Sequence, residues 1–471
     1  MLFNSLEFVL FFALVYGLYI VFVHRAQNVL LLVASYVFYG WWDWRFLGLI
    51  LASTIVDFVC GIKIGATEAA PRRRLWLWVS MTSNLGVLGF FKYFNFFAES
   101  LDRALAPLGM HADWTFATII LPVGISFYTF QTMSYTIDVY RREMKPTHDF
   151  LNFAVFVSYF PQLVAGPIER ARVLLPQIER PRRIRYQQLR DGFRLILVGY
   201  ILKLVVAENM APFTRSLFNQ PEHHHGLNVL FGLYAAAFQI FGDFAGYTNI
   251  ARGISKLMGI ELMRNFDQPY FATNPSDFWR RWHISLSTWL RDYLYISLGG
   301  NRGGQLILYR NLMITMVLGG LWHGAALNFV AWGVFHGTIL ILHRIMKPTL
   351  DTWSDRLPLN RPIFKTTLMI LFFHVTCLGW MLFFVKRLSH VKTLLINLFQ
   401  SVEPVDITLL VVVGLFGGMA LMMDILRERH PTDEEPVISS RGGRLVAYCA
   451  GVAVLMMFGA FQSSEFIYFQ F

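Results

Sequence analysis

Long apolar stretches run through this sequence from one end to the other. A helix that spans a membrane needs about 20 mainly apolar residues, and stretches of that kind recur along the whole chain. Their bounds are near 3–23, 28–42, 46–64, 75–97, 117–140, 191–212, 226–250, 306–322, 325–346, 366–386, 405–426 and 444–462. The sequence therefore predicts an all-α integral membrane protein with about 11–12 transmembrane helices plus re-entrant or interfacial helices.

The composition agrees with a membrane environment for the whole chain. Hydrophobic residues make up 55% of it and charged residues 15%, whereas soluble domains carry about 25% charged residues. No half of the chain is polar, so we expect a single membrane domain over residues 1–471. The first apolar run lacks a basic leading region and a clear small-residue cleavage site, so we expect it to be retained as a helix.

The net charge of +11 comes from basic residues whose positions predict how the chain crosses the membrane and do not indicate binding of nucleic acid. A nucleic-acid surface needs basic residues clustered on one soluble face, but here they lie in short loops between apolar runs. The loops at 24–25, 63–74 and 141–145 are basic, while the intervening loop at 99–114 is not. Because cytoplasmic loops are rich in Lys and Arg, this alternation predicts a multi-pass protein with its N-terminus outside and membrane lipids as partners.

Metal and disulfide frameworks are not predicted. The three cysteines all lie inside apolar stretches and form no Cys-x-x-Cys pair. His223, His224 and His225 are neighbours in a loop and lack the spacing of zinc ligands. We therefore expect no metal, and we interpret these histidines as a solvated outer loop.

Two irregular segments interrupt the run of predicted helices. Residues 150–168 contain two prolines, and basic loops on the same predicted side flank them, so we expect this segment to dip into the membrane or lie along it. Residues 264–302 interleave arginine and tryptophan, which is typical of an amphipathic helix at the membrane interface. We place that helix on the cytoplasmic side.

His323 is the first candidate for chemistry because it lies between two apolar runs, where ionisable residues are costly and usually functional. A continuous helix from Arg310 would carry it roughly 20 Å into the membrane. Glycines around it leave space for a substrate or for another backbone. A general base for a hydroxyl proton and a buried histidine that joins two helices are both consistent with this pattern.

His283 and several intramembrane polar residues are weaker candidates. His283 is either an interfacial histidine without a role or a partner of His323 that orients substrate or moves a proton. Four residues are predicted to line a substrate tunnel, although hydrogen bonding between helices explains the polar ones equally well. They are Tyr128, Gln131, Asp243 and Trp322.

Several motifs together resemble the membrane-bound O-acyltransferase family, in particular its bacterial branch that acetylates alginate. They cover the chain from about residue 30 to its end. The motifs are LPVGISFYTFQ at 121–131, FPQLVAGPI at 160–168, DFAGY at 243–247, FWRRWHISLS at 278–287, GGLWHGA at 319–325 and FIYFQF at 466–471.

The resemblance implies a funnel of helices that narrows toward the reaction centre, with His323 as the invariant catalytic histidine and His283 as the second histidine of the bacterial branch. It also implies acetyl-coenzyme A as a cosubstrate, no bound cofactor, and a place in the bacterial inner membrane. The implied acceptor is an exported polysaccharide or a partner-protein hydroxyl, with extracytoplasmic acetylation proteins as partners. Basic residues such as Arg170 and Arg280 would attract the donor's phosphates, but ordinary positive-inside loops explain them too.

Other functions fit parts of this pattern. A transporter or flippase of an acyl or glycan intermediate would also use many helices and intramembrane polar residues, but the chain shows no repeated halves. A non-catalytic scaffold in a secretion complex is a third reading. Among acyltransferases, acceptors in cellulose, peptidoglycan or teichoic acid stay open beside alginate.

Overall fold

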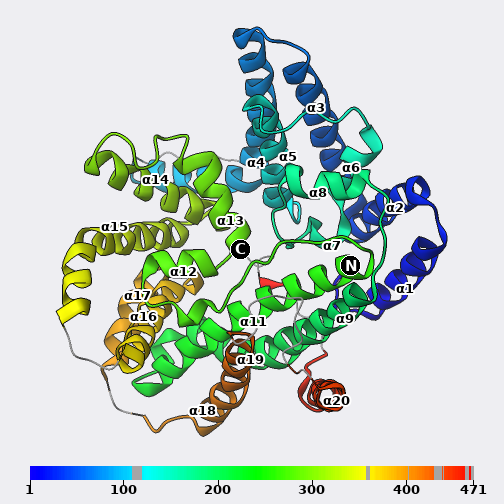
Figure 1. The fold of residues 1–471 in the computed structure, drawn as a ribbon. Coiled ribbons are helices and arrows are strands. Elements are labelled where there is room, and N and C mark those ends of the chain that lie inside the picture. Colours follow the sequence, from blue (N-terminus) through cyan, green and yellow to red (C-terminus); the bar gives the residue numbers. More distant parts are fainter. Residues whose placement is uncertain are drawn as a thin grey trace. The chain divides into compact units, whose positions relative to one another are not determined.

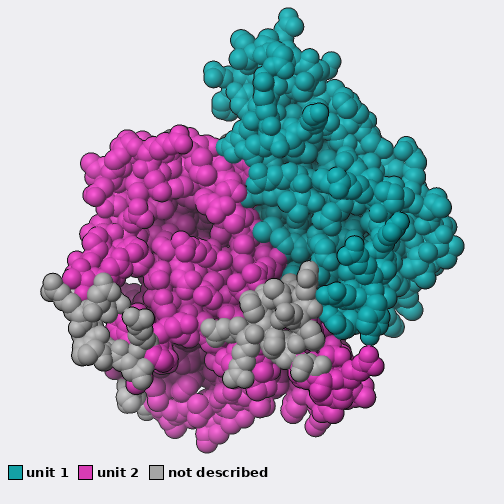
Figure 2. All heavy atoms as spheres, in the orientation of Figure 1, with its two compact units in different colours: residues 1–193, 251–263 teal, residues 194–250, 264–471 magenta. Residues whose placement is uncertain are grey.

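The computed structural model describes residues 1–108, 119–356, 361–400, 403–428, 438, 440–461 and 466–467. All regular structure in these ranges is helical (Figure 1). The described chain forms two compact units, residues 1–193 with 251–263 and residues 194–250 with 264–471 (Figure 2). We call them unit 1 and unit 2. The two units are defined by which residues pack together, so they do not test the predicted single membrane domain over 1–471, which stays a prediction.

Unit 1 contains the N-terminal helices. They are α1 (Leu6–Val21), α2 (His24–Asp43), the 3-10 turn η1 (Trp44–Phe46), α3 (Leu47–Gly65), α4 (Ala70–Leu105), the 3-10 turn η2 (Ala106–Leu108), α5 (Ile125–Tyr140), α6 (Phe150–Ser158), α7 (Phe160–Leu163), α8 (Ala171–Glu179) and the first half of α9 (Tyr186–Tyr200).

Unit 2 begins within α9 and holds most of α11. Its elements are the π-helical η3 (Ile201–Ala207), α10 (Glu208–Asn219), η4 (Pro221–His223), α11 (Leu227–Leu257), η5 (Pro269–Phe271), α12 (Pro275–Arg281), α13 (Ile284–Trp289), the π-helical η6 (Leu290–Tyr295), α14 (Gln305–His323), α15 (Leu327–Arg356), α16 (Arg361–Phe384), α17 (Leu388–Leu398), α18 (Ile407–Val412), the π-helical η7 (Val413–Gly417), α19 (Gly418–Glu428) and α20 (Arg441–Phe458).

Helices occupy all of the predicted apolar stretches, which confirms the all-α membrane fold. Seven described helical stretches are long and apolar enough to cross a membrane. Their outer faces are apolar as well: α2 exposes Val29 and Val33, and α20 exposes Met456 and Met457. Exposed apolar side chains on long helices are expected where lipid is the solvent.

The segment 150–168 forms two short helices, and its predicted course into or along the membrane stays a prediction. Asp149 caps α6 by accepting a hydrogen bond from the Asn152 N–H at 3.2 Å. The helix then breaks at Tyr159, just before Pro161 in α7. Most of the segment is buried inside unit 1.

The amphipathic interfacial helix predicted for 264–302 is wrong in form. The chain makes two short helices, α12 and α13, which are separated at His283 by a left-handed backbone conformation. Phe278 and Trp282 turn inward and pack on Trp380 of α16 at 6.4 and 4.7 Å between ring centroids. Large aromatic side chains that find partners within the protein are thus buried and do not face lipid head groups.

The predicted loop at 99–114 is wrong in its first part, because α4 continues to Leu105. The rest of that loop from residue 109 and the end of the terminal motif 466–471 lie outside the described residues.

Candidate active site

His323 ends the helix α14, which runs without a break from Gln305. The continuous helix that the depth argument required is therefore present: thirteen residues beyond Arg310 correspond to about 20 Å along the axis. After a short turn the chain returns as α15, so the two helices form a hairpin (Figure 1). The His323 side chain is buried within unit 2.

Glycines let the two helices of this hairpin approach closely. A Cβ on Gly320 would lie 2.2 Å from the carbonyl oxygen of Phe329, and one on Gly333 would lie 2.5 Å from that of Met316. Such distances exclude any side chain at either position. Of the two uses predicted for the small residues around His323, the structure therefore shows the close approach of another backbone.

Aromatic rings enclose His323. Its ring centroid lies 5.1 Å from that of Trp322, 5.1 Å from that of Trp332 and 5.3 Å from that of Phe383. The rings of Trp332 and Phe383 meet it at steep angles, 82° and 76°. Packing of this kind holds an imidazole in one orientation.

His283 lies beside His323, with 6.2 Å between the two ring centroids. The sequence places them forty residues apart and says nothing about their separation, so this neighbourhood is a result of the fold. His283 is fully buried, and Phe244 of α11 meets its ring edge-on at 4.6 Å. His283 therefore lies in the interior of unit 2, and the choice between an interfacial histidine without a role and a partner of His323 stays open.

Burial decides the charge of His283, which lies outside the candidate spanning helices. Desolvation lowers the pKa of its imidazole to about 3. The ring is thus neutral near neutral pH, where it has one nitrogen that donates and one that accepts a hydrogen bond. Trp322, predicted as a tunnel residue, lies against both histidines, 5.7 Å from His283.

Asp243 belongs to a buried ion cluster. One of its oxygens accepts a hydrogen bond from Lys203 Nζ at 2.6 Å, and the other accepts one from the Ile467 N–H at 2.7 Å. Lys203 also contacts Glu208 at 3.3 Å. Because both oxygens bind other segments, the contacts favour the helix-linking alternative, and a tunnel role for Asp243 stays a prediction.

Tyr128 and Gln131 belong to α5 in unit 1. Gln131 Nε2 donates to the carbonyl oxygen of Phe156 at 2.5 Å and so joins α5 to α6. Tyr128 is buried, and its hydroxyl makes no hydrogen bond to another described residue. Their tunnel role is likewise untested.

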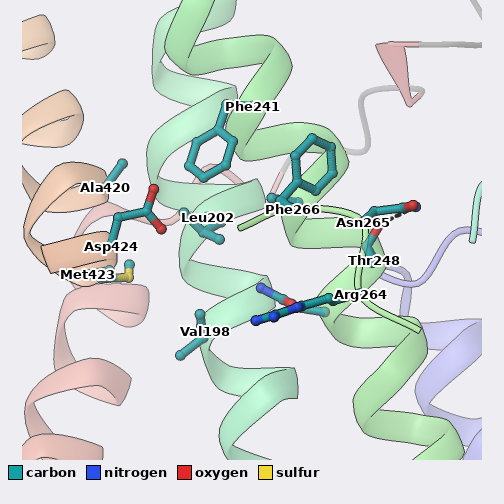
Figure 3. Close-up of a pocket in the computed structure, with 12 residues that line it drawn as sticks. Val198, Leu202, Phe241, Thr248, Arg264, Asn265, Phe266, Ala420, Met423 and Asp424 are labelled. Carbon is teal, nitrogen blue, oxygen red and sulfur yellow. Dashed lines mark hydrogen bonds between the residues drawn. The ribbon is translucent and has the colours of Figure 1, made fainter. Parts of the chain in front are cut away.

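Figure 3 shows a cavity in unit 2. One of its lining residues, Asn265, accepts a hydrogen bond from the Ser285 N–H, two residues after His283. Phe266 lines the cavity and also packs edge-on against Phe244 at 5.1 Å. Asn265 lines it beside Thr248, to which its amide donates at 3.4 Å. The other lining residues are Val198, Leu202, Phe241, Ala245, Asn249, Arg264, Ala420, Met423 and Asp424.

Sequence reasoning missed several residues of this site. Phe244, Trp332 and Phe383 shape the surroundings of the two histidines, but an aromatic residue in an apolar helix gives no signal of such a role. Asn265 was also missed, because its importance depends on contacts with a segment twenty residues away.

Comparison with known proteins shows the family of this chain. The model of the MBOAT, membrane-bound O-acyltransferase family, matches residues 139–384, which include both histidines. Several known proteins are similar to this chain over most of their own length.

The probable alginate O-acetylase AlgI of Azotobacter vinelandii is 42% identical over 83% of this chain and 76% of its own length. Its counterpart in Pseudomonas putida is 36% identical over the full length of both. The peptidoglycan O-acetyltransferase of Helicobacter pylori is 34% identical over 76% of this chain and 71% of its own.

Proposed function

Because the chain belongs to the membrane-bound O-acyltransferase family, we propose that this multi-pass membrane O-acyltransferase moves an acetyl group from a cytoplasmic thioester to an exported polysaccharide. The expected donor is acetyl-coenzyme A, and the expected acceptor is an alginate-like sugar hydroxyl or the hydroxyl of an extracytoplasmic partner protein. The bacterial inner membrane is the expected location. The names of the relatives from Azotobacter and Pseudomonas support the alginate type, while the Helicobacter relative keeps peptidoglycan open.

The observation that carries this proposal is the pair of buried histidines with ring centroids 6.2 Å apart. A hydroxyl that hydrogen-bonds to two nitrogens places each of them about 2.8 Å from its oxygen. A substrate hydroxyl can therefore contact both rings at once. His323 then acts as the general base, and neutral His283 orients the hydroxyl by a hydrogen bond.

The reaction balances with these groups alone. His323 accepts the hydroxyl proton as the hydroxyl oxygen attacks the carbonyl carbon of the thioester. A C–O bond forms, the C–S bond breaks, and the thiolate leaves with the proton returned by His323. The aromatic enclosure keeps water away from the thioester, which protects the acetyl group from hydrolysis.

Transfer of labelled acetyl from acetyl-coenzyme A tests the proposal. Membranes that contain the wild-type protein are compared with His323→Ala and with His336→Ala, at equal amounts of folded protein. His336 is a matched control because it is also a buried histidine that packs on Trp332, with 4.6 Å between the two ring centroids.

Label lost only in His323→Ala supports the base assignment. Label retained in that variant contradicts it. If none of the three proteins transfers label, either the donor is not acetyl-coenzyme A or transfer requires an extracytoplasmic partner. Adding a membrane extract from an alginate-acetylating bacterium decides between these two explanations. Movement of a lipid-linked sugar across the membrane without acetyl transfer would favour the flippase.

A further inference from the structure

The turn that presents His283 has a backbone conformation that its own side chain disfavours. His283 has φ 42° and ψ 54°, the left-handed region, where the Cβ of an L-residue crowds the following carbonyl. Only two other described non-glycine residues, Arg142 and Gln268, share a positive φ. Such a conformation persists only where the surrounding structure holds it.

Asn265 holds this turn through two hydrogen bonds. Its backbone oxygen accepts from the Ile284 N–H at 2.9 Å, and its side-chain Oδ1 accepts from the Ser285 N–H at 3.2 Å. These are the first two N–H groups of α13, which have no partner within the helix itself. Asn265 thus caps α13 from a distant segment, directly after the residue that reaches toward His323.

Two further contacts fix Asn265 in turn. Its Nδ2 donates to Thr248 Oγ1 at 3.4 Å, on the wall of the cavity in Figure 3. The neighbouring Asp267 N–H donates to the Arg281 carbonyl oxygen at 2.9 Å, so residues 265–267 run alongside the end of α12 and the His283 turn. Asn265 is fully buried, so no water competes for these bonds.

We propose that Asn265 is a positioning residue that sets the orientation of the His283 ring toward His323. The proposal rests on the proposed acyl transfer for its effect on rate, but the orientation of His283 is a property of the turn itself. Without the Oδ1 acceptor, the first turn of α13 loses its cap and the backbone of His283 relaxes toward an ordinary conformation. The ring then leaves its place beside His323.

Four variants separate positioning from general stability. Asn265→Ala removes the acceptor, Asn265→Asp keeps an oxygen in the same place, and Thr248→Val removes only the long contact to the amide. Asn397→Ala is the matched control. Asn397 supports another turn of unit 2 in the same way, since its Nδ2 donates to the Pro221 carbonyl at 3.0 Å and its own carbonyl accepts from the Gly226 N–H at 2.8 Å.

Two readouts are measured on each variant. The first is the kcat and the KM for acetyl-coenzyme A in the labelled-acetyl assay. The second is the rate at which diethyl pyrocarbonate modifies His283 in the purified protein, followed by mass spectrometry of the peptide that contains it. We expect Asn265→Ala to lower kcat at least tenfold with KM changed less than twofold, and to speed modification of His283 at least fivefold.

Asn265→Asp should recover at least a third of the wild-type kcat, and Thr248→Val and Asn397→Ala should stay within twofold of wild type in both readouts. Wild-type protection of His283 in Asn265→Ala would overturn the proposal. An equal loss in Asn397→Ala would overturn it as well, because the effect would then be general. If wild-type protein transfers no acetyl, the proposed function fails, while the modification rates still decide on Asn265.

Discussion

The two units bury ionisable side chains among helices in different ways. In unit 1, Asp57 of α3 accepts hydrogen bonds from Ser80 at 2.5 Å and from Asn84 at 2.8 Å, both on α4. In unit 2, His323 is packed among the rings of Trp322, Trp332 and Phe383. Asp57 thus accepts hydrogen bonds from the neighbouring helix, and His323 has three aromatic rings around it.

This difference separates a structural polar group from a chemical one. The carboxylate of Asp57 joins α3 to α4, and Ser80 extends the network to Thr136 of α5 at 2.9 Å. Hydrogen bonds between helices of this kind are the usual role of polar residues in membranes. His323 instead lies among aromatic rings, 6.2 Å from a second histidine, and the proposed proton transfer rests on that placement.

The largest expected effect lies in the histidine pair. We expect His323→Ala to lower the rate of acetyl transfer about a thousandfold, in the range of general acid–base catalysis, and His283→Ala to lower it about a hundredfold. If the two act on one hydroxyl, the double variant should be no slower than His323→Ala alone, because residues that work as a unit are not additive. Rates measured at matched protein amounts for all four proteins test this. Losses that multiply would show that the histidines act separately.

The next largest expected effect is a loss of stability when the ion cluster of Lys203, Glu208 and Asp243 in unit 2 is broken. Asp243→Ala leaves Lys203 buried, with Glu208 as its remaining ion-pair partner among the described residues, and frees the Ile467 N–H. We expect a loss of about 3 kcal/mol, the lower end for breaking a buried ion pair, with transfer per folded molecule within twofold of wild type. Thermal unfolding in detergent and the labelled-acetyl assay measure the two quantities.

The variant Lys203→Met with Asp243→Leu is the control for this effect, because it removes both charges and should recover part of the stability. If Asp243→Ala instead lowers transfer at unchanged stability, Asp243 lines the substrate path, as the sequence predicted.

Much of the fold could be predicted because lipid demands long apolar helices, and length alone marks them. The break between α12 and α13 could not, because it depends on Asn265, twenty residues away. The π-helical stretches η3, η6 and η7 gave no signal either. A helix that widens for one turn has the same apolar composition as a regular one.

The candidate site divides in the same way. His323 stood out from sequence because an ionisable residue flanked by glycines between apolar runs is unusual. The polar residues Gln131 and Asp243 attracted the same attention, but the fold gives them hydrogen bonds to other helices. Sequence marks which polar residues lie in the membrane, whereas only tertiary contacts show which of them are held by partners.

Replacing Asp57 tests whether a buried carboxylate in unit 1 serves stability alone, and its expected effect on stability is smaller than that of Asp243→Ala. Asp57→Ala removes one acceptor each from Ser80 and Asn84, although Asn84 Nδ2 still donates to the Ser80 carbonyl at 3.0 Å. A buried donor that loses its acceptor costs about 1–3 kcal/mol. Ser80 retains Thr136 as a partner, so we expect a total loss of about 2 kcal/mol. The unfolding midpoint should fall while transfer per folded molecule stays within twofold of wild type. A larger loss of transfer than of stability would give Asp57 a part in the chemistry.

The smallest expected effect concerns a strained backbone position in unit 1, the counterpart of His283. Arg142 has φ 62° and follows the end of α5, where the N–H groups of Arg142 and Glu143 donate to the carbonyls of Val139 and Asp138. This is the Schellman ending, which favours glycine at the left-handed residue. The end of α11 has the same bonds with Gly259 in that place.

Arg142→Gly should therefore raise stability by a few tenths of a kcal/mol to about 1 kcal/mol, since the exposed ion pair with Glu68 that it removes contributes little. His283→Gly relieves the same backbone strain but removes the ring, so we expect it to lower transfer about as much as His283→Ala while stability is kept. Unfolding midpoints and transfer rates of both variants measure this contrast. A much larger loss of transfer in His283→Gly than in His283→Ala would contradict this expectation, because the strained backbone, and not only the ring, would then be required. A loss of transfer in Arg142→Gly would contradict it as well.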